Sequence, residues 1–316
     1  MPSQDSALTG FVNRGDFVES LIVATRADFD ALVSASGLDI GKVYRVGTPE
    51  VWYRATSAVT FVDTTVGASL EYHAHFYAPL AIDSDVKARD ISGALSDGAF
   101  QANLSAATAW ATAGFLTQPN PTVNGNLSLV AFPALSWNWA AGDSLFVFWV
   151  GRGTPEGSDT SWLGDTSGYA SGNGVRLVCT SGGNVKVNCY QNSGSVSVFG
   201  ATSSAAVIEA SVTHSFAVCI SPDGMCYWSD GARNAGHSSG FLMPSGGPCD
   251  TSNAVTLKLG GDGATVGGIQ NGIALQTKAL VILKGRRDDP PAVADLDVLV
   301  AALHRNPQAL VSSSAW

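Results

Sequence analysis

Short apolar runs separated by polar turn sequences recur along the chain from about residue 99 onward, and this pattern predicts short β-strands. Nine segments rich in β-branched or aromatic residues are separated by turn sequences such as Ser-Gly-Gly and Ser-Pro-Asp-Gly. The predicted strands are residues 126–132, 144–150, 174–180, 184–191, 195–199, 212–220, 224–229, 254–259 and 279–284. Many short strands with turn signals between them predict a mainly β fold, an antiparallel two-sheet β-sandwich.

Helical periodicity appears at the C-terminal end of this region. Val293, Leu296, Leu299, Val300 and Leu303 share one helical face. The sequence Asp-Pro-Pro at residues 289–291 favours the start of a helix, and a proline at residue 307 stops it. We therefore expect a short terminal helix after the last strand.

The first 70 residues predict a separate small unit of one helix and a β-meander. Thr25 caps a helix with Phe29, Leu32 and Val33 on one face, ending near Gly37. Residues 42–46, 51–54 and 59–62 follow as three short strands. This unit has too few apolar groups for a stable core, so we expect it to pack against copies of itself or another protein.

These patterns divide the chain into three predicted parts. Residues 1–70 form the anchoring or oligomerisation unit, and residues 99–316 form the sandwich. Residues 71–98 contain one strand near residues 70–78 and then a stretch rich in Ser, Asp and Gly, which indicates a connector.

Composition and charge exclude two classes of partner. The formal net charge of −9 has no cluster of Lys or Arg beside it, which argues against nucleic acid. No apolar run approaches the roughly 18 residues of a membrane span, so we expect no membrane insertion. A charged fraction of only 14% with 35 glycines is typical of a β-rich fold with many turns.

Five cysteines lie in the second half of the chain, without C-x-x-C spacing, which argues against a zinc site. Cys219 and Cys226 flank the turn at residues 221–224 and should face each other across a hairpin. Both a disulfide and a pair of buried free thiols fit this position.

The order of strands resembles the concanavalin A-like lectin fold, in the laminin-G-like form found on bacteriophage fibres and spikes. The resemblance covers roughly residues 99–316. An aromatic strand at residues 144–150 ends in Trp-Val, and Arg152 begins the loop after it. The segments that carry the rest of the resemblance are the hairpin 175–178 and 185–187, the run 213–231 with its Ser-Pro-Asp-Gly turn and Ser-Asp-Gly ending, and the strands 257–261 and 274–284.

The resemblance implies an attachment protein on the fibre or head spike of a phage-like particle. Such a protein is a homotrimer that is assembled in the host cytoplasm and exposed on the particle surface. The N-terminal unit, with GKVYRV and VWYRA segments similar to anchoring segments of tail fibres, would bind other virion proteins. The sandwich would bind a host cell-surface polysaccharide. Two alternatives stay open: a capsid- or tail-decorating protein without a ligand, and a polysaccharide depolymerase.

Motifs for catalysis are missing from the sequence. Glycosidases of this fold carry two carboxylates on one strand as E-x-D-x-x-E, and no such run occurs here. No G-x-S-x-G elbow or P-loop occurs either. We therefore expect a binding protein and not an enzyme.

A polar loop at residues 158–173 is the predicted carbohydrate site, because aromatic faces and polar side chains together suit a sugar. Its candidate residues are Trp162, Tyr169, Asp159, Asp165 and Asn173. In the alternative interpretation, Trp162 folds back to cap the edge of the sandwich. Other tryptophans are assigned to structure: Trp149 and Trp228 to the core, and Trp137 and Trp139 to one side of a strand.

Two metal sites are conceivable, and no other cofactor is expected. Asp165, Asn173 and Asp262 could provide oxygen ligands for Ca²⁺, although no EF-hand signature is present. His73 and His75 should share one face of a strand, so a threefold fibre would gather six imidazole nitrogens around its axis as an octahedral metal site. The alternative for this pair is two ordinary surface histidines.

Overall fold

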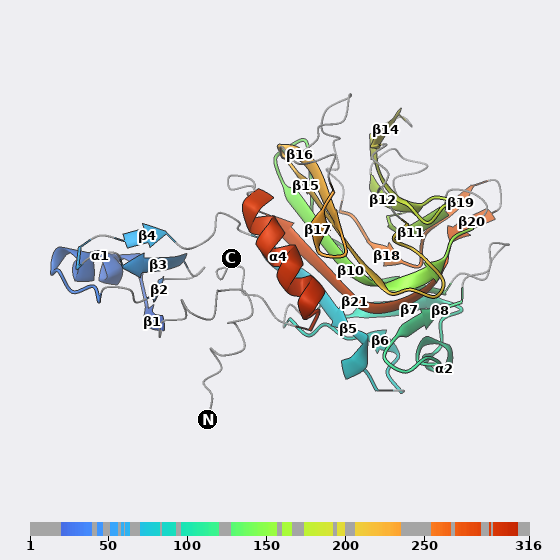
Figure 1. Cartoon of the computed structure of the whole chain (residues 1–316), viewed down its shortest axis with the longest axis horizontal. Helices are drawn as coiled ribbons and strands as arrows, with labels where there is room; N and C mark the ends of the chain where they lie inside the picture. The colour runs from blue at the N-terminus through green and yellow to red at the C-terminus, as the bar shows by residue number, and fades with distance from the viewer. Residues whose placement is uncertain are drawn as a thin grey trace.

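The computed structural model describes residues 20–39, 43–46, 51–55, 58–59, 61–63, 70–82, 84–92, 96–119, 128–156, 160–165, 174–191, 195–199, 206–234, 254–266, 269–285, 291 and 293–308. The strands of these residues form a four-stranded, a seven-stranded and a ten-stranded sheet. The two larger sheets face each other as a β-sandwich (Figure 1). The predicted fold class is therefore confirmed.

The four-stranded sheet belongs to the N-terminal unit and has the order β1-β2-β3-β4. The elements are β1 (Ser20–Val23), α1 (Arg26–Ser34), β2 (Val43–Val46), β3 (Val51–Ala55) and β4 (Phe61–Asp63). Helix α1 begins as predicted, because the Thr25 side chain accepts a hydrogen bond from the Asp28 amide. Strand β1 is an addition to the prediction. It pairs in parallel with β2, so the unit opens with a β-α-β crossover.

Among the described residues of this unit, one buried apolar cluster is present. It consists of Phe29, Leu38, Tyr44 and Val46. Leu32 and Val33 pack against them from the predicted helix face. In contrast, Leu21 and Ile22 of β1 are exposed, Ile22 by 75% of its surface.

The sandwich consists of two large sheets. The seven-stranded sheet contains, in order, β17 (Ala232–Arg233), β16 (Gly224–Ser229), β15 (His214–Ser221), β10 (Ser144–Thr154), β21 (Ala274–Gly285) and β5 (Leu70–Tyr77), with β8 (Leu116–Gln118) also paired to β21. The ten-stranded sheet contains, in order, β14 (Ser195–Phe199), β13 (Val185–Gln191), β12 (Gly174–Cys179), β11 (Thr160–Gly164), β18 (Lys258–Leu259), β9 (Ser128–Ala131), β7 (Gly98–Ala102) and β6 (Lys87–Ala88), with β19 (Gly261–Val266) and β20 (Ile269–Gly272) attached beside β11. Two short helical segments, η2 (Ala78–Leu80) and α2 (Ala106–Ala109), connect strands.

Residues 71–98 are part of the sandwich, which corrects the predicted connector. Strand β5 pairs along its length with β21, and β6 and β7 join the opposite sheet next to β9. The polar composition of this segment suggested a linker. However, backbone pairing at a sheet edge does not require apolar side chains, so composition is a weak guide there.

The hairpin of β15 and β16 has the predicted register. Cys219 lies directly opposite Cys226 across the Ser221–Gly224 turn. Both thiols are free and buried, which matches one of the two alternatives. Burial raises the pKa of Cys219 well above its ordinary value and that of Cys226 to about 12, so both stay protonated at neutral pH.

Helix α4 (Val293–Arg305) covers part of the outward face of the seven-stranded sheet (Figure 1). Its buried residues pack on Phe146 and Phe148 of β10 and on Val281 of β21. The indole of Trp228 donates a hydrogen bond of 2.8 Å to Asp297 of α4. The predicted terminal helix is therefore confirmed in position and in its apolar face. None of the described helices is long and apolar enough to cross a membrane.

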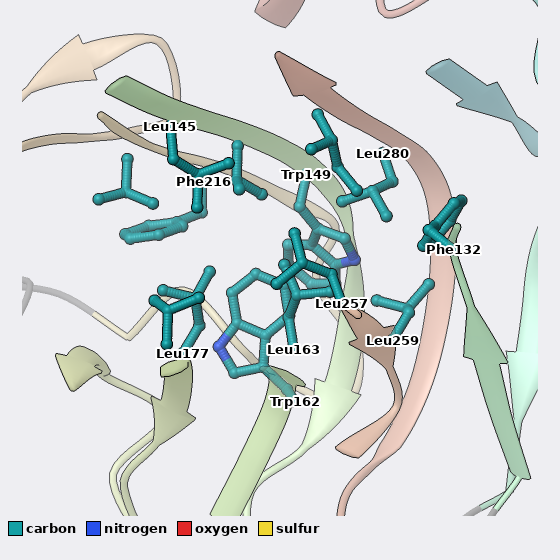
Figure 2. Close-up of a cluster of buried hydrophobic side chains, with 14 of the residues drawn as sticks. Phe132, Leu145, Trp149, Trp162, Leu163, Leu177, Phe216, Leu257, Leu259 and Leu280 are labelled. Carbon is teal, nitrogen blue, oxygen red and sulfur yellow. The ribbon is translucent and has the colours of Figure 1, made fainter. Parts of the chain in front are cut away.

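The inward faces of the two sheets enclose the main core (Figure 2). Trp149 is fully buried there, and Trp228 is fully buried on the outward side, as predicted. Trp137 and Trp139 are also buried, but they precede β10 in a loop and do not lie on a strand. Each still finds a polar partner, because the indole of Trp137 donates to Asp143 and that of Trp139 to Ser221.

Candidate functional site

Trp162, the central residue of the predicted carbohydrate loop, is a core residue. It lies on β11 and exposes none of its surface. Its ring centroid is 5.2 Å from that of Trp149 and 6.2 Å from that of Phe216 (Figure 2). A buried ring cannot stack on a sugar, so the prediction of an exposed platform is wrong for this residue. Its position also differs from an edge cap, because it lies at the centre of the cluster.

A β-bulge explains this placement. The pairing of β11 with β12 shifts register between Ser161 and Leu163, so Trp162 is an extra residue in the strand. As a result Trp162 and Leu163 both join the inward core. Asp165, directly after the strand, is also buried. Asp159, Tyr169 and Asn173 lie outside the described residues.

A second bulge separates His73 from His75. The pairing of β5 with β21 shifts at this point, and His73 is the residue without a directly opposite partner. The Nε2 atom of His73 lies 2.8 Å from the Pro133 carbonyl, whereas that of His75 lies 2.7 Å from the Pro307 carbonyl, beyond α4. The expectation that the two imidazoles share one face is therefore wrong.

The surroundings of both histidines favour the neutral form of the imidazole ring. Burial lowers the pKa of His73 and of His75 below the ordinary value of 6.5. Among the described residues, no three His, Cys, Asp or Glu side chains gather as metal ligands would. Asn173 and the side chain of Asp262, the other residues considered for Ca²⁺, lie outside what the structure describes.

A cavity of about 260 Å³ lies where β8, β10 and β21 meet. The described residues around it are Thr117, Gln118, Pro119, Arg152, Gly153, Thr154, Ala210, Ala274, Leu275 and Gln276. No carboxyl, imidazole or thiol group occurs among them. The described lining can form hydrogen bonds and one ionic contact, and the carboxyl pair that most glycosidases use is not among these residues.

The strand register places the polar residues of this lining on one face. Arg152 of β10 and Thr117 of β8 are both paired with Gln276 of β21, so their side chains form a row across three strands. Thr154 lies two residues beyond Arg152 and shares its face. This is the outward face, because Arg152 continues the alternation of Phe146, Phe148 and Val150 beneath α4.

Arg152 is held from two sides. Its Nε donates to the Gln276 side-chain oxygen, and its guanidinium lies 5.0 Å from the centroid of the Phe115 ring. The Gln276 amide is fixed in turn, because its Nε2 donates to Thr112 Oγ1 at 3.0 Å. The guanidinium group therefore has a defined orientation beside the cavity.

Gln118 has a different role at the same corner. It follows Thr117 and points to the opposite, inward face. Its amide nitrogen donates at 2.8 Å to Ser128 of β9 and to Leu259 of β18. Gln118 therefore ties the two sheets together behind the cavity.

Sequence reasoning assigned Arg152 to the start of a loop and did not identify this row. The available signal was the segment Gly-Arg-Gly-Thr, which continues the alternation of the preceding strand. An added Cβ at Gly151 would lie 2.5 Å from the Trp149 ring, and one at Gly153 would lie 2.7 Å from Leu275. The pattern that extends β10 to this cavity is therefore glycine at the inward-facing positions and polar residues at the outward-facing positions.

Comparison with known proteins gives similarity to solved structures only. No family model and no curated protein matches the chain. One similar structure is domain 4 of AbnA, a GH43 extracellular arabinanase from Geobacillus stearothermophilus, in complex with arabinotriose. Its TM-score is 0.46 at 14% identity, with 74% of this chain and 98% of that chain covered.

Two sialidase structures are similar at comparable or lower levels. Trypanosoma rangeli sialidase in complex with sialic acid has a TM-score of 0.45 at 10% identity, covering 76% of this chain. This chain spans about a third of that sialidase, 33% of its length. The Ruminococcus gnavus IT-sialidase CBM40 bound to α2,3-sialyllactose has a TM-score of 0.37 at 14% identity, covering 50% of this chain and 82% of that chain. We assign no ligand to this chain from scores at this level.

Proposed function

We propose that this protein binds a saccharide in the cavity between β8, β10 and β21 and does not cleave it. The observation that carries this proposal is the row of Thr117, Gln276 and Arg152, in which the guanidinium group is oriented beside a cavity. Defined polar groups of this kind give a small-molecule site its orientation and specificity. A sugar presents hydroxyl groups that can both donate to and accept from such a row.

The size of the cavity limits the part of the ligand that enters. A volume of about 260 Å³ is close to the lower end, about 300 Å³, of the usual range for ligand pockets. We therefore expect one sugar unit in the cavity and the remainder of a glycan outside it.

Two threonine substitutions test the site. Thr154 is exposed at the cavity, so Thr154→Val should remove one neutral hydrogen bond to a ligand, about 0.5–1.5 kcal/mol of binding free energy, and leave stability unchanged. Thr277 is the matched control, since its buried hydroxyl accepts from the Trp149 indole at 2.9 Å on the inward face. Thr277→Val should lower stability and leave the affinity for ligand unchanged.

Titration calorimetry and thermal unfolding of both variants would measure these effects on a panel of neutral and acidic oligosaccharides. Equal affinities for wild type and Thr154→Val would contradict the placement of the ligand. A reducing-end assay on the same panel tests hydrolysis. We expect no new reducing ends, and released oligosaccharides would favour the depolymerase alternative.

We also propose the attachment role that the sequence resemblance implies. In this role the sandwich contacts a host polysaccharide from the surface of a phage-like particle, and the N-terminal unit joins a homotrimer or other virion proteins. The exposed apolar side chains of Leu21 and Ile22 support an association of this unit. A decorating protein without a ligand is the alternative role.

Sedimentation of the full chain tests the oligomer. We expect a trimer at micromolar concentration and partial dissociation in the variant Ile22→Lys. Val59 is another exposed apolar residue of the same unit, so Val59→Lys shows whether any surface charge has this effect. A monomeric wild-type protein would contradict the proposal.

A further inference from the structure

Arg152 has no acidic partner among the described residues. Its described contacts are the Gln276 side-chain oxygen and the Phe115 ring. Two other arginines differ in this respect, because Arg26 pairs with Asp30 and Arg89 with Asp85. A half-buried cation without a counter-ion is costly unless an anion completes the site.

The described contacts of Arg152 leave part of its guanidinium group available for a further partner. Gln276 engages the Nε atom, and no described residue is hydrogen-bonded to the two terminal nitrogens. A guanidinium fork that is already oriented matches the two oxygens of a carboxylate in a bidentate pair. The Thr112–Gln276–Arg152 chain of hydrogen bonds limits the conformational entropy that the pair would cost.

The rest of the row is neutral and accepts or donates hydrogen bonds. Thr154 is exposed at the cavity, whereas Thr117 lies across Gln276 with a buried hydroxyl group that has no partner among the described atoms. A simple carboxylic acid would leave these groups unused, and a neutral sugar would leave Arg152 without a counter-ion. A sugar that carries a carboxylate satisfies both.

We propose that the cavity is specific for an acidic sugar, whose carboxylate pairs with Arg152 and whose hydroxyl groups bind the neighbouring Thr154. This inference rests on the proposed saccharide-binding function. The common chemistry is a carboxylate on a sugar ring. Its sources are a uronic acid, with the carboxylate at C6, and a 2-keto acid sugar, with the carboxylate next to the anomeric carbon.

A matched pair of sugars isolates the carboxylate. Methyl glucuronide and methyl glucoside differ only at C6, and N-acetylneuraminic acid represents the second source. Ligand-observed NMR would measure binding of all three to the full chain at low and high salt. We expect one of the acids to bind at least about tenfold more tightly than methyl glucoside, and this preference to weaken with salt because it is ionic.

Three variants assign the preference to one residue. Arg152→Gln should abolish the preference for the acid, and Arg152→Lys should retain part of it, because Lys keeps the charge and loses the fork. Arg305→Gln is the control, since Arg305 is an exposed arginine at the end of α4, away from the cavity. It should bind as wild type does.

The outcomes separate this inference from the proposed function. Equal binding of the neutral sugar and both acids, still weakened by Thr154→Val, would overturn the acidic specificity and retain the saccharide site. A preference for acid that persists in Arg152→Gln would overturn the role of Arg152. Binding of none of these sugars, or of the larger oligosaccharide panel, would overturn the proposed function itself.

Discussion

The outward face of the seven-stranded sheet has two different regions along the same strands, one covered by a helix and one beside a cavity. Beneath α4, Phe146 and Phe148 of β10 are fully buried by an apolar helix face. Four residues further along β10, on the same face, Arg152 lies beside a cavity. The part of this face under α4 therefore contributes stability, whereas the part at Arg152 lies beside a cavity, where we propose recognition. Trp162, the described aromatic residue of the predicted sugar loop, belongs to the inward core.

The largest effect is expected for a substitution in the inward core, which tests whether a core aromatic residue contributes to stability and not to binding. Trp162→Ala removes a fully buried ring and should lower the free energy of unfolding by about 3–5 kcal/mol. Trp162→Phe should cost much less, because it keeps an aromatic ring and removes an indole N–H that has no partner among the described atoms. Denaturant unfolding measures both. A stable Trp162→Ala variant that has lost saccharide binding would reverse the assignment of Trp162.

The covered half of the outward face can be tested with two neighbouring positions of α4. Leu299 is fully buried, so Leu299→Ala should cost about 2–5 kcal/mol. Val298 is 48% exposed, and Val298→Ala should change stability by no more than about 0.5 kcal/mol. Saccharide binding at a temperature where both variants are folded should equal that of wild type. Weaker binding by the folded Leu299→Ala variant would show that the two halves are coupled.

The smallest expected effect is a pH dependence at the border of the covered half. His75 contacts the Pro307 carbonyl and stacks on Tyr72, and burial lowers its pKa below 6.5. Asp90, which accepts a hydrogen bond from the His75 amide, opposes this shift without cancelling it. The folded state therefore binds fewer protons than the unfolded state. The stability from neutral His75 is complete above pH 6.5 and decreases as the pH falls toward the lower, folded-state pKa.

Thermal unfolding between about pH 7.5 and about pH 5.5 measures this dependence, in a range above most carboxyl titrations. We expect the melting temperature of wild type to fall across it. His73 has a lowered pKa as well, so the double variant His73→Gln/His75→Gln should show a flatter profile. An unchanged slope in the double variant would contradict the contribution of these rings.

Much of the sandwich could be predicted from the sequence, because its strands and α4 carry clear periodicity. The apolar run at residues 144–150 lies in a strand that the structure extends to Thr154, and the face of Leu296, Leu299 and Leu303 is buried as expected. The bulges at His73 and Trp162 could not be predicted. One extra residue reverses the side to which the following residues point, and no local sequence signal marks it.

The candidate site could not be predicted from the sequence for a different reason. Arg152 and Gln276 are far apart in the chain and become neighbours only through the pairing of β10 with β21. A single arginine between glycines has no motif that indicates binding. The register of three strands was needed to place Thr117 in the same row.

The alternation of glycine and polar residues at the end of β10 has a consequence for how binding preference could be altered. Gly151 and Gly153 face the tightly packed interior, where a Cβ would collide with Trp149 or Leu275, so these two positions are closed to substitution. Residues 152 and 154 point away from that interior. A library restricted to positions 152, 154 and 276 would therefore vary the proposed ligand preference on an unchanged scaffold, with little of the stability loss that usually accompanies new specificities.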